Sequence, residues 1–437
     1  MLLQEVNWIR LYSHKFCPLL RKAALEWYRP LKLVPCFIQK PIKFFKQKWY
    51  KKRVIVQLKD NPEGSFLFTQ LASLAGCRIE KKLPLINSFA TKVNAKSLQV
   101  LAQNDYVHKI WFDRDVKAVL DVASPTVGSP PLWDKNVDGK GIVVAVLDTG
   151  IFHHPDLSDR IKDFVDLINQ KTDTYDDNGH GTHVAGDIAS SGIQSELLFR
   201  GPAPEAQLVG VKVLDKMGSG SISTVIEGIQ WCVDNKDTTG ISVLNMSLGA
   251  AATESYTNDP VCQAVEKAWR AGLVVCVAAG NDGPQPQTIG SPGIDPIIIT
   301  VGALDDAGTI ESEDDRVAGF SSRGPTIDGL TKPDVIAPGN NIISLRSPGS
   351  MLDKKSRDGR VNEWYTSLSG TSMATPVCAG VVAQMLQANG SLTPDQVKAS
   401  LMESARTLDL DPNIQGAGII DAQSAVNAIT KEDKNSD

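Results

Sequence analysis

Residues 142–150 read Ile-Val-Val-Ala-Val-Leu-Asp-Thr-Gly, an unbroken apolar run that ends in Asp148 and is followed by a glycine that permits a turn. Apolar runs of the same kind recur at 208–214, 241–246, 273–278 and 297–301. Runs of this length are typical of strands buried on both faces of a parallel sheet. We therefore expect residues 123–430 to form one α/β domain with a mainly parallel central sheet.

Helical patterns lie between these runs. Residues 261–269 carry an apolar stripe at helical spacing, and Gly272 stands where a helix C-cap belongs. Thr393-Pro394-Asp395-Gln396 reads as a capping box that opens another helix. Strands that alternate with helices favour the doubly covered sheet.

A smaller α+β domain is predicted for residues 53–122. Residues 54–59 alternate apolar and polar side chains, as a half-buried strand does, and 107–112 is a second strand candidate. Helices are expected around 64–75 and 95–102. A Ser, Gly and Pro-rich linker follows at 124–131, and residues 431–437 form a polar tail.

The charge is unevenly distributed. The 437 residues have a net charge of −5, yet residues 1–53 carry 13 Lys and Arg against two acids. The acidic remainder argues against nucleic-acid binding. Residues 1–52 form a basic arm rich in aromatics, which favours either a packed or solvated extension or a weak contact with an anionic surface; the first interpretation is preferred.

The cysteines and the N-terminus bear on the compartment. Seven cysteines at wide spacings, without a Cys-x-x-Cys pair, argue against a disulfide framework or a zinc knuckle and favour a reducing compartment. Charged residues interrupt the first 22 positions, so no signal peptide is predicted. No run of 18 apolar residues occurs, so no transmembrane segment is predicted. The expectation is a cytoplasmic protein, with release from the cell left open.

Three Gly-flanked segments carry side chains suited to chemistry. Asp148 ends a strand, where sites in open α/β sheets gather, although a lone Asp there is more often a turn cap. His180 stands at the entry to a helix, and a histidine near neutrality can accept and return a proton. Ser372 is placed at a helix N-terminus by Pro376, where backbone amides favour an incoming negative charge, although a Ser N-cap alone is common.

Other histidines have plainer interpretations. His180 and His183 at i, i+3 could form half of a zinc site, but no Glu-x-x-His or Cys completes one. We expect His183 to be a buried structural residue. His153 and His154 are expected to be solvated loop residues.

Taken together, the three segments weaken the plain interpretations. Asp148, His180 and Ser372 occur in that chain order. Asn281 follows a further apolar strand, where its amide could donate to a tetrahedral oxyanion.

Residues 148–150, 180–186 and 370–376 resemble the three signatures of the subtilisin-like serine proteases, the subtilases. Further matching segments are 245–249, 320–325 and 332–339, so the resemblance covers nearly all of the larger domain. The basic arm, the absence of a signal peptide and the modest size are similar to the AprX-like members. The resemblance implies a subtilisin-like three-layer fold preceded by a propeptide-like domain.

The resemblance also implies roles for the residues. Ser372 would be the nucleophile, His180 the general base and then acid, and Asp148 the residue that orients the imidazole. Asn281 and the Ser372 backbone N–H would form the oxyanion hole. A chemically required cofactor is not expected.

A polypeptide substrate would add as a strand between two segments of the enzyme. These would be Gly218-Ser219-Gly220 and Ser247-Leu248-Gly249. The S1 pocket would be lined by Ala278, Ala279 and Gly280, with Gly290 at its floor. A glycine floor leaves room, so the expected specificity is broad with large apolar P1 residues.

Residues 53–122 would act as an inhibitory propeptide, with self-cleavage expected within 113–124. The alternative is a permanent accessory domain. Structural calcium is common in the family, and Asp156 matches one ligand, but the loop 190–201 is unusual in length and leaves metal ligands unassigned. The alternative to an endopeptidase is a catalytically silent subtilase that serves as a binding scaffold.

Overall fold

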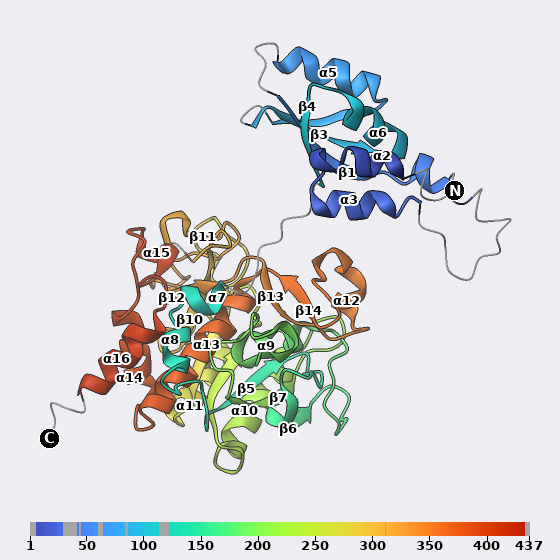
Figure 1. The fold of residues 1–437 in the computed structure, drawn as a ribbon. Helices are drawn as coiled ribbons and strands as arrows, with labels where there is room; N and C mark the ends of the chain where they lie inside the picture. Colours follow the sequence, from blue (N-terminus) through green and yellow to red (C-terminus); the bar gives the residue numbers. More distant parts are fainter. Residues whose placement is uncertain are drawn as a thin grey trace. The chain divides into compact units, whose positions relative to one another are not determined.

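The computed structural model describes residues 6–28, 42, 45–59, 64–83, 86–112, 122–310 and 312–432. The chain divides into two compact units, Met1–Lys117 and Ala118–Asp437 (Figure 1). Each is described below by itself.

The larger, C-terminal unit is organised around a mainly parallel sheet, as predicted. Its strands follow the order β11-β10-β9-β8-β5-β7-β6, with β12 paired to β10. Only the β10–β11 pair of this sheet is antiparallel in the described chain. The strands are β5 (Val143–Asp148), β6 (Ile161–Asp166), β7 (Gln207–Lys212), β8 (Ile241–Met246), β9 (Val274–Ala278), β10 (Ile299–Asp305), β11 (Arg316–Val317) and β12 (Val335–Pro338).

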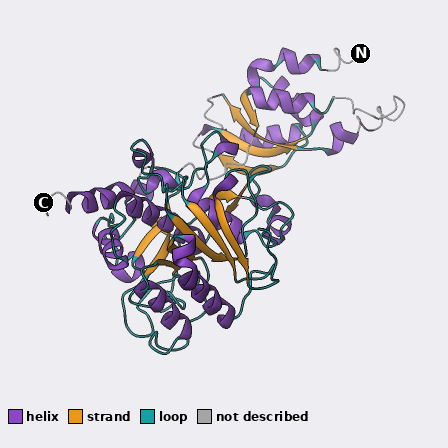
Figure 2. Ribbon diagram, turned by 90° about the horizontal axis from the view of Figure 1, so that it is seen from below, coloured by secondary structure: helices purple, strands orange, loops and turns teal. Residues whose placement is uncertain are grey.

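The sheet is buried because helices cover both faces (Figure 2). α9 (His180–Ala189) and α13 (Thr371–Ala388) pack against each other and on one face. α10 (Ile222–Thr239) and α11 (Pro260–Arg270) pack against each other and on strands of the opposite face. Every residue of β5 is buried, which explains its continuous apolar sequence.

The remaining elements of this unit are shorter or peripheral. α14 (Pro394–Glu403) begins with the expected capping box at Thr393, and it packs on α16 (Ala422–Glu432). The others are α7 (Ala123–Thr126), α8 (Pro130–Trp133), η3 (Ser158–Arg160), η4 (Ile193–Ser195), η5 (Ser312–Asp314), the hairpin β13 (Ile342–Leu345) and β14 (Tyr365–Leu368), α12 (Met351–Lys355), η6 (Arg357–Gly359) and α15 (Pro412–Gln415).

The N-terminal unit has the α+β character that the sequence predicts. Its antiparallel sheet has the order β2-β3-β1-β4. The strands are β1 (Lys52–Leu58), β2 (Ile79–Leu83), β3 (Ser88–Val93) and β4 (Val107–Phe112), and the helices are α2 (Asn7–Leu11), η1 (Ser13–Lys15), α3 (Pro18–Leu25), α5 (Gly64–Leu74) and α6 (Ala95–Gln103).

The described part of the basic arm packs into this unit. Trp27 is 1% exposed, and Leu20 belongs to the same apolar cluster as the strands β1 and β4. Lys52 pairs with Glu26 at 2.8 Å, and Lys15 donates to the carbonyl of Asn104. The described part of the arm therefore shares a core with the small domain. Contact with an anionic surface stays a prediction.

In the described part of the chain, none of the helices combines the length and the apolar character that crossing a membrane requires. Of the seven cysteines, the six that lie in described positions are all free thiols.

Candidate active site

The sheet brings the predicted residues to one edge. Asp148 is the last residue of β5, and Ser247 directly follows β8. β5 and β8 are parallel neighbours with Val146 opposite Asn245, so Asp148 and Ser247 each lie two residues beyond a paired position. Asn281 follows β9, the next strand along. The carboxyl ends of parallel strands meet at the same edge, where sites of such folds form.

Asp148 and His180 form a buried hydrogen-bonded pair. The Asp148 side chain is fully buried, and its Oδ1 and Oδ2 lie 2.8 and 2.9 Å from His180 Nδ1. A carboxylate only accepts, so Nδ1 donates and Nε2 is left as the acceptor. Burial disfavours the charged imidazole, but the adjacent Asp148 carboxylate outweighs it and raises the pKa of His180 above its ordinary value. The ring is therefore a stronger base than a free histidine.

A close approach between α9 and β5 makes this pair. Gly181 directly follows His180, and a Cβ at that position would lie 2.2 Å from the carbonyl oxygen of Gly150 and 3.1 Å from Asp148 Cβ. Only glycine lets the first turn of α9 sit this close to the end of β5.

Asp176 fixes the start of α9, and sequence analysis did not single it out. Its Oδ1 accepts hydrogen bonds from Gly179 N and Thr149 Oγ1, and its Oδ2 accepts from Thr182 N and Oγ1. Burial raises the pKa of this carboxyl, although these donors oppose the shift. The sequence feature that could have indicated this role is the position of Asp176, four residues before His180 in the loop that leads into a helix.

Ser372 occupies the first turn of α13, as predicted. Its Oγ donates to the carbonyl of Ser247 at 3.1 Å. Pro376 has no N–H to bond the Ser372 carbonyl four residues earlier, and the Ser247 hydroxyl donates to that carbonyl at 2.8 Å instead. Two hydrogen bonds thus anchor Ser372 beside the end of β8, one strand from Asp148.

Asn281 presents its amide nitrogen beside Ser372. Its Oδ1 accepts from Thr371 N at 2.9 Å and from Thr371 Oγ1 at 3.1 Å, which fixes the amide so that Nδ2 is the outward group. A Cβ built on Gly370 would lie 3.4 Å from Asn281 Nδ2 and 3.6 Å from Ser372 N. These two N–H donors therefore border one small space that the absence of a side chain at Gly370 keeps open.

The segments expected to bind substrate also lie at this edge. Residues 218–220 are exposed in the loop between β7 and α10. Gly290 N donates to the carbonyl of Ala279, and Ala250 and Ser291 exchange two backbone hydrogen bonds. The segments 247–250, 278–280 and 290–291, which include the expected S1 residues, are thereby held together.

Lys212 stabilises the segments that carry the site, and the sequence analysis did not identify this role. It ends β7 and is fully buried, and its Nζ donates to Thr149 O, Leu214 O and Asp177 Oδ1 at 2.6–2.9 Å. A lysine inside an otherwise apolar strand was the available signal. It ties the segment after Asp148 to the loop that leads to His180.

The other histidines have structural partners. His183 is fully buried, with Nδ1 at 2.9 Å from Asp187 Oδ2 and Nε2 near the carbonyls of Ile342 and Thr366. Within the described ranges, no cluster of three His, Cys, Asp or Glu side chains is arranged to hold a metal. His153 is exposed as expected, but the expectation of a solvated His154 is wrong: it is fully buried and bonds the carbonyl of Trp364.

The surroundings of Asp156 do not fit a calcium ligand. Its Oδ2 accepts hydrogen bonds from the Tyr365 hydroxyl and from Ser190 Oγ, and its Oδ1 accepts from Gln194 N at 2.9 Å. The Arg160 guanidinium donates to the backbone carbonyls of Asp156, Ala189 and Ala206. Calcium requires six or more oxygens free of such donors. Protein N–H and O–H groups therefore occupy the oxygens that a cation would need here.

Comparison with known proteins identifies the family of this chain. Residues 139–418 match the subtilase family. The chain is 47% identical over 434 residues to serine protease AprX of Bacillus subtilis, covering 96% of this chain and 98% of that protein. It is 33% identical to a thermostable alkaline protease of Halalkalibacterium halodurans, covering 80% and 94%, and 36% identical to subtilisin Savinase of Lederbergia lenta, covering 68% and 96%. The chain therefore belongs to the subtilase family of serine proteases.

Proposed function

We propose that this endopeptidase hydrolyses peptide bonds through an acyl-enzyme formed on Ser372. The observations that support this most directly are the Asp148–His180 hydrogen bond and the anchoring of Ser372 at the end of the neighbouring strand β8. When a substrate carbonyl binds, Ser372 Oγ leaves the Ser247 carbonyl and attacks the substrate carbon. His180 Nε2 accepts the hydroxyl proton and returns it to the leaving amine, while Asp148 holds the imidazolium.

The tetrahedral oxyanion would lie in the space bordered by Asn281 Nδ2 and Ser372 N. Both donors are fixed before substrate arrives, the first by Thr371 and the second by the start of α13. Preorganised donors stabilise charge that develops in the transition state without a reorganisation cost. Water then hydrolyses the acyl-enzyme by the same steps, with His180 as the base.

The S1 specificity is proposed to favour large apolar residues such as Phe or Leu. We expect kcat/KM for peptides with Phe at P1 to exceed that for Asp or Glu by at least about 10-fold, because a single methylene group in a hydrophobic pocket is already worth about 10- to 200-fold. Cleavage after Asp or Glu at an equal rate would contradict this specificity.

A Cβ on Gly290, the expected floor of the S1 pocket, would lie 2.7 Å from the Ala250 carbonyl oxygen. At this distance the backbone of the pocket must shift, so Gly290→Ala should lower the ratio of kcat/KM for peptides with Phe at P1 to that for peptides with Ala at P1. Gly319→Ala, at an open position, should leave this ratio unchanged.

The region in which Asp156 contacts Ser190, Gln194 and Tyr365 is proposed to be stable without calcium. We expect EDTA to shift the melting temperature by less than about 2 °C, and by the same amount in the wild type and in Asp156→Asn. Tyr365→Phe removes a donor to a buried carboxylate and should lower stability by about 1–3 kcal/mol, unlike Tyr256→Phe elsewhere in the unit. A chelator effect that disappears in Asp156→Asn would show that Asp156 binds the metal after all.

A further inference from the structure

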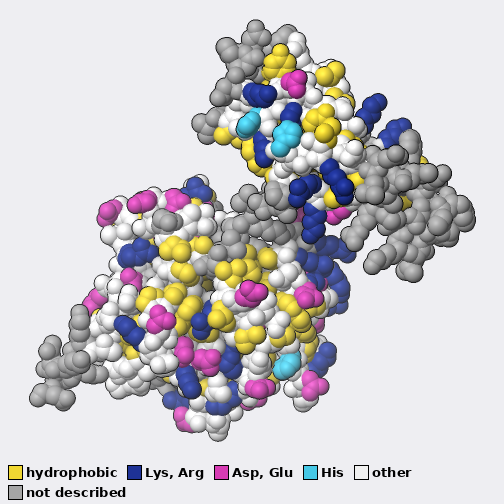
Figure 3. All heavy atoms as spheres, in the orientation of Figure 1, with side chains coloured by type: hydrophobic (Ala, Val, Ile, Leu, Met, Phe, Trp, Pro, Cys, Tyr) yellow, Lys and Arg dark blue, Asp and Glu magenta, His cyan; other side chains and the backbone are white. Residues whose placement is uncertain are grey.

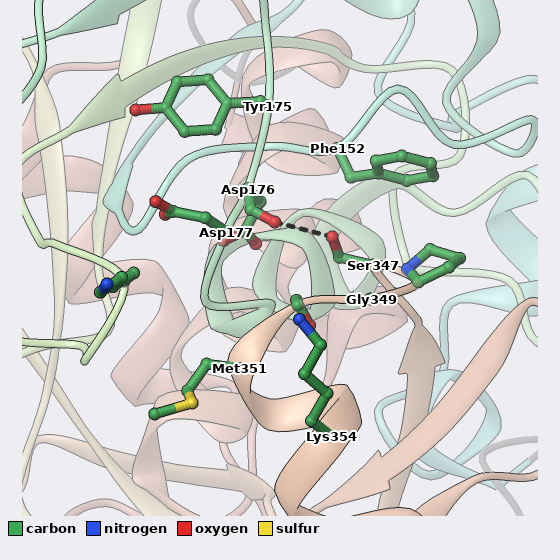
Figure 4. A pocket seen from close by; sticks show the side chains of 11 residues that line it. Phe152, Tyr175, Asp176, Asp177, Ser347, Gly349, Met351 and Lys354 are labelled. Atoms are coloured by element: carbon green, nitrogen blue, oxygen red, sulfur yellow. Dashed lines mark hydrogen bonds between the residues drawn. The ribbon is translucent and has the colours of Figure 1, made fainter.

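A pocket of about 490 Å³ lies beside the loop that carries His180. Residues 175–177 form one wall and the segment 347–354 forms the other, with Phe152 and Lys216 completing it. Figure 4 shows Ser347 bonded to the backbone of Asp176 and the Lys354 side chain rising from α12 toward the Ser347–Gly349 turn. Apart from Asp176 and Asp177, the residues that line this pocket have no role in the site described above.

Backbone contacts join the pocket wall to the residues before His180. Met351 N donates to the carbonyl of Asp177 at 2.9 Å, and Leu352 N donates to that of Asn178 at 2.8 Å. A Cβ on Gly179 would lie 2.6 Å from Ser350 Oγ. The start of α12 is therefore in contact with the loop that leads to His180, so the pocket adjoins the segment that positions this residue.

An ion-pair network fixes the wall in place. Asp353 Oδ1 lies 2.5 Å from Arg346 Nε and 2.6 Å from Arg360 Nε, and Gly349 N donates to Asp353 Oδ2. Burial opposes ionisation of Asp353, but the Arg346 guanidinium and the other donors prevail and lower its pKa to about 2. These contacts hold the segment between β13 and β14 in a defined conformation.

The two lysines that line the pocket remain available to a ligand, whereas its two acids already have partners. Asp177 pairs with the buried Lys212, and Asp176 is satisfied by backbone and hydroxyl donors. Lys216 and Lys354 are exposed, and neither takes part in an ion pair among the described residues. Figure 3 shows Lys and Arg side chains gathered on the face of the C-terminal unit over α12.

From this geometry we infer that the pocket is a substrate subsite, in which Lys216 and Lys354 select an acidic side chain close to the scissile bond. The inference rests on the proposed function, because the ligand is the substrate of that reaction. Phe152 and Met351 supply apolar wall for the stem of such a side chain. Exposed ion pairs of this kind contribute modestly, so the selection is one of a few-fold and not of orders of magnitude.

The chain itself contains a matching sequence. Within the segment where self-cleavage is expected and at its start, the large apolar residues Leu120 and Phe112 are each followed directly by an aspartate, Asp121 and Asp113. Cleavage after either residue would place an acid at P1′. Residues 113–121 lie outside the described part of the chain, so this match is one of sequence alone.

The test uses synthetic peptides with the sequence of residues 117–124 and Asp, Asn or Lys at the position of Asp121. We expect the purified wild type, expressed as the whole chain and allowed to process itself, to cleave the Asp peptide with a kcat/KM about three- to tenfold above the Asn peptide, and the Lys peptide below both. A second series moves one Asp through P2, P1′, P2′ and P3′ in a neutral frame to locate the position. The preference should shrink in 0.5 M NaCl, because salt screens exposed charges.

Variants assign the preference to the pocket. The double substitution Lys216→Ala, Lys354→Ala should bring the Asp-to-Asn ratio to about one, and Lys216→Glu, Lys354→Glu should favour the Lys peptide. Lys355→Glu, which changes the neighbouring charge on α12 outside the pocket lining, should keep the wild-type ratio. A ratio that the double variants leave unchanged, or an equal response to Lys355→Glu, would overturn the inference.

Binding separates this inference from the proposed function. The Ser372→Ala protein should bind the fluorescent Asp peptide more tightly than the Asn peptide, and this difference should vanish when both lysines are replaced. If the wild type cleaves no peptide and is not labelled by an active-site serine phosphonate after limited proteolysis, but this binding difference is present, the proposed mechanism fails and the subsite stands. If the wild type cleaves all peptides equally and no binding difference exists, the subsite fails and the mechanism stands.

Discussion

Ser372→Ala is expected to abolish peptide hydrolysis and to leave the protein at full length. In subtilisin, removal of the nucleophilic serine lowers kcat by about 10⁶-fold, and we expect a loss of that order. The substitution deletes the attacking oxygen and one hydrogen bond to Ser247, and alanine is favourable within a helix. The fold should therefore persist, and circular dichroism would verify it.

The measurement pairs turnover of a chromogenic peptide carrying Phe or Leu at P1 with intact masses. The wild type should be active and trimmed within residues 113–124, because we propose that the N-terminal unit is removed by self-processing. Ser369→Ala is the matched control, since it lies three residues upstream at an exposed hydroxyl that accepts from Asn341 N. It should behave as the wild type in both measurements.

Other outcomes would be informative. Processing of pure Ser372→Ala protein at the wild-type rate would contradict self-cleavage. If both proteins are inactive and full length, an active-site serine phosphonate applied after limited proteolysis decides between two interpretations. Labelling of the wild type identifies a latent zymogen, and its absence favours the catalytically silent scaffold.

Asn281→Ala is expected to lower kcat by about 10²- to 10³-fold, with KM nearly unchanged. The magnitude is that measured in subtilisin for its oxyanion asparagine. The reason is that Asn281 Nδ2 donates only to charge that develops in the transition state, whereas Asn281 Oδ1 is engaged with Thr371 throughout. Steady-state kinetics on the peptide with Phe at P1 check the result, and a near-normal kcat would contradict the assignment of Asn281 to the oxyanion hole.

Two companion variants test the geometry of this site. Asn281→Asp keeps an acceptor for Thr371 but removes the donor, so it should be as slow as Asn281→Ala. Gly370→Ala adds a methyl group 3.4 Å from Asn281 Nδ2 and 3.6 Å from Ser372 N, which are ordinary contact distances. It should therefore fold normally and still lose turnover, because the methyl group fills the space between the two donors.

Much of the fold could be predicted because its signals are local. The apolar runs at 142–147 and 273–278 correspond to β5 and β9, and the capping box at Thr393 begins α14 where expected. Burial on both faces requires such runs, and helix ends require specific side chains. The short strands β11, β13 and β14 were missed, since two to four residues carry too little periodicity to be recognised.

The positions of Asp148, His180, Ser372 and Asn281 could be read from sequence because each stands at a strand end or helix start marked by glycine. The pairing of these residues is a different matter. The hydrogen bond between His180 and Asp148 joins residues 32 apart, and that between Ser372 and Ser247 joins residues 125 apart. The order of these residues in the sequence suggested that they act together, and the parallel sheet brings them to one of its edges.

Sequence by itself therefore determined which chemical groups this protein has and the type of element on which each lies. Tertiary structure decided what each group meets. Asp156, which matches one calcium ligand of the family, accepts a hydrogen bond from the hydroxyl of Tyr365, 209 residues away, and Lys212 is buried against the carbonyl of Thr149. The physical reason is that turns, caps and periodicity depend on neighbouring residues, whereas the partner of a buried polar group is set by which distant segments pack against it.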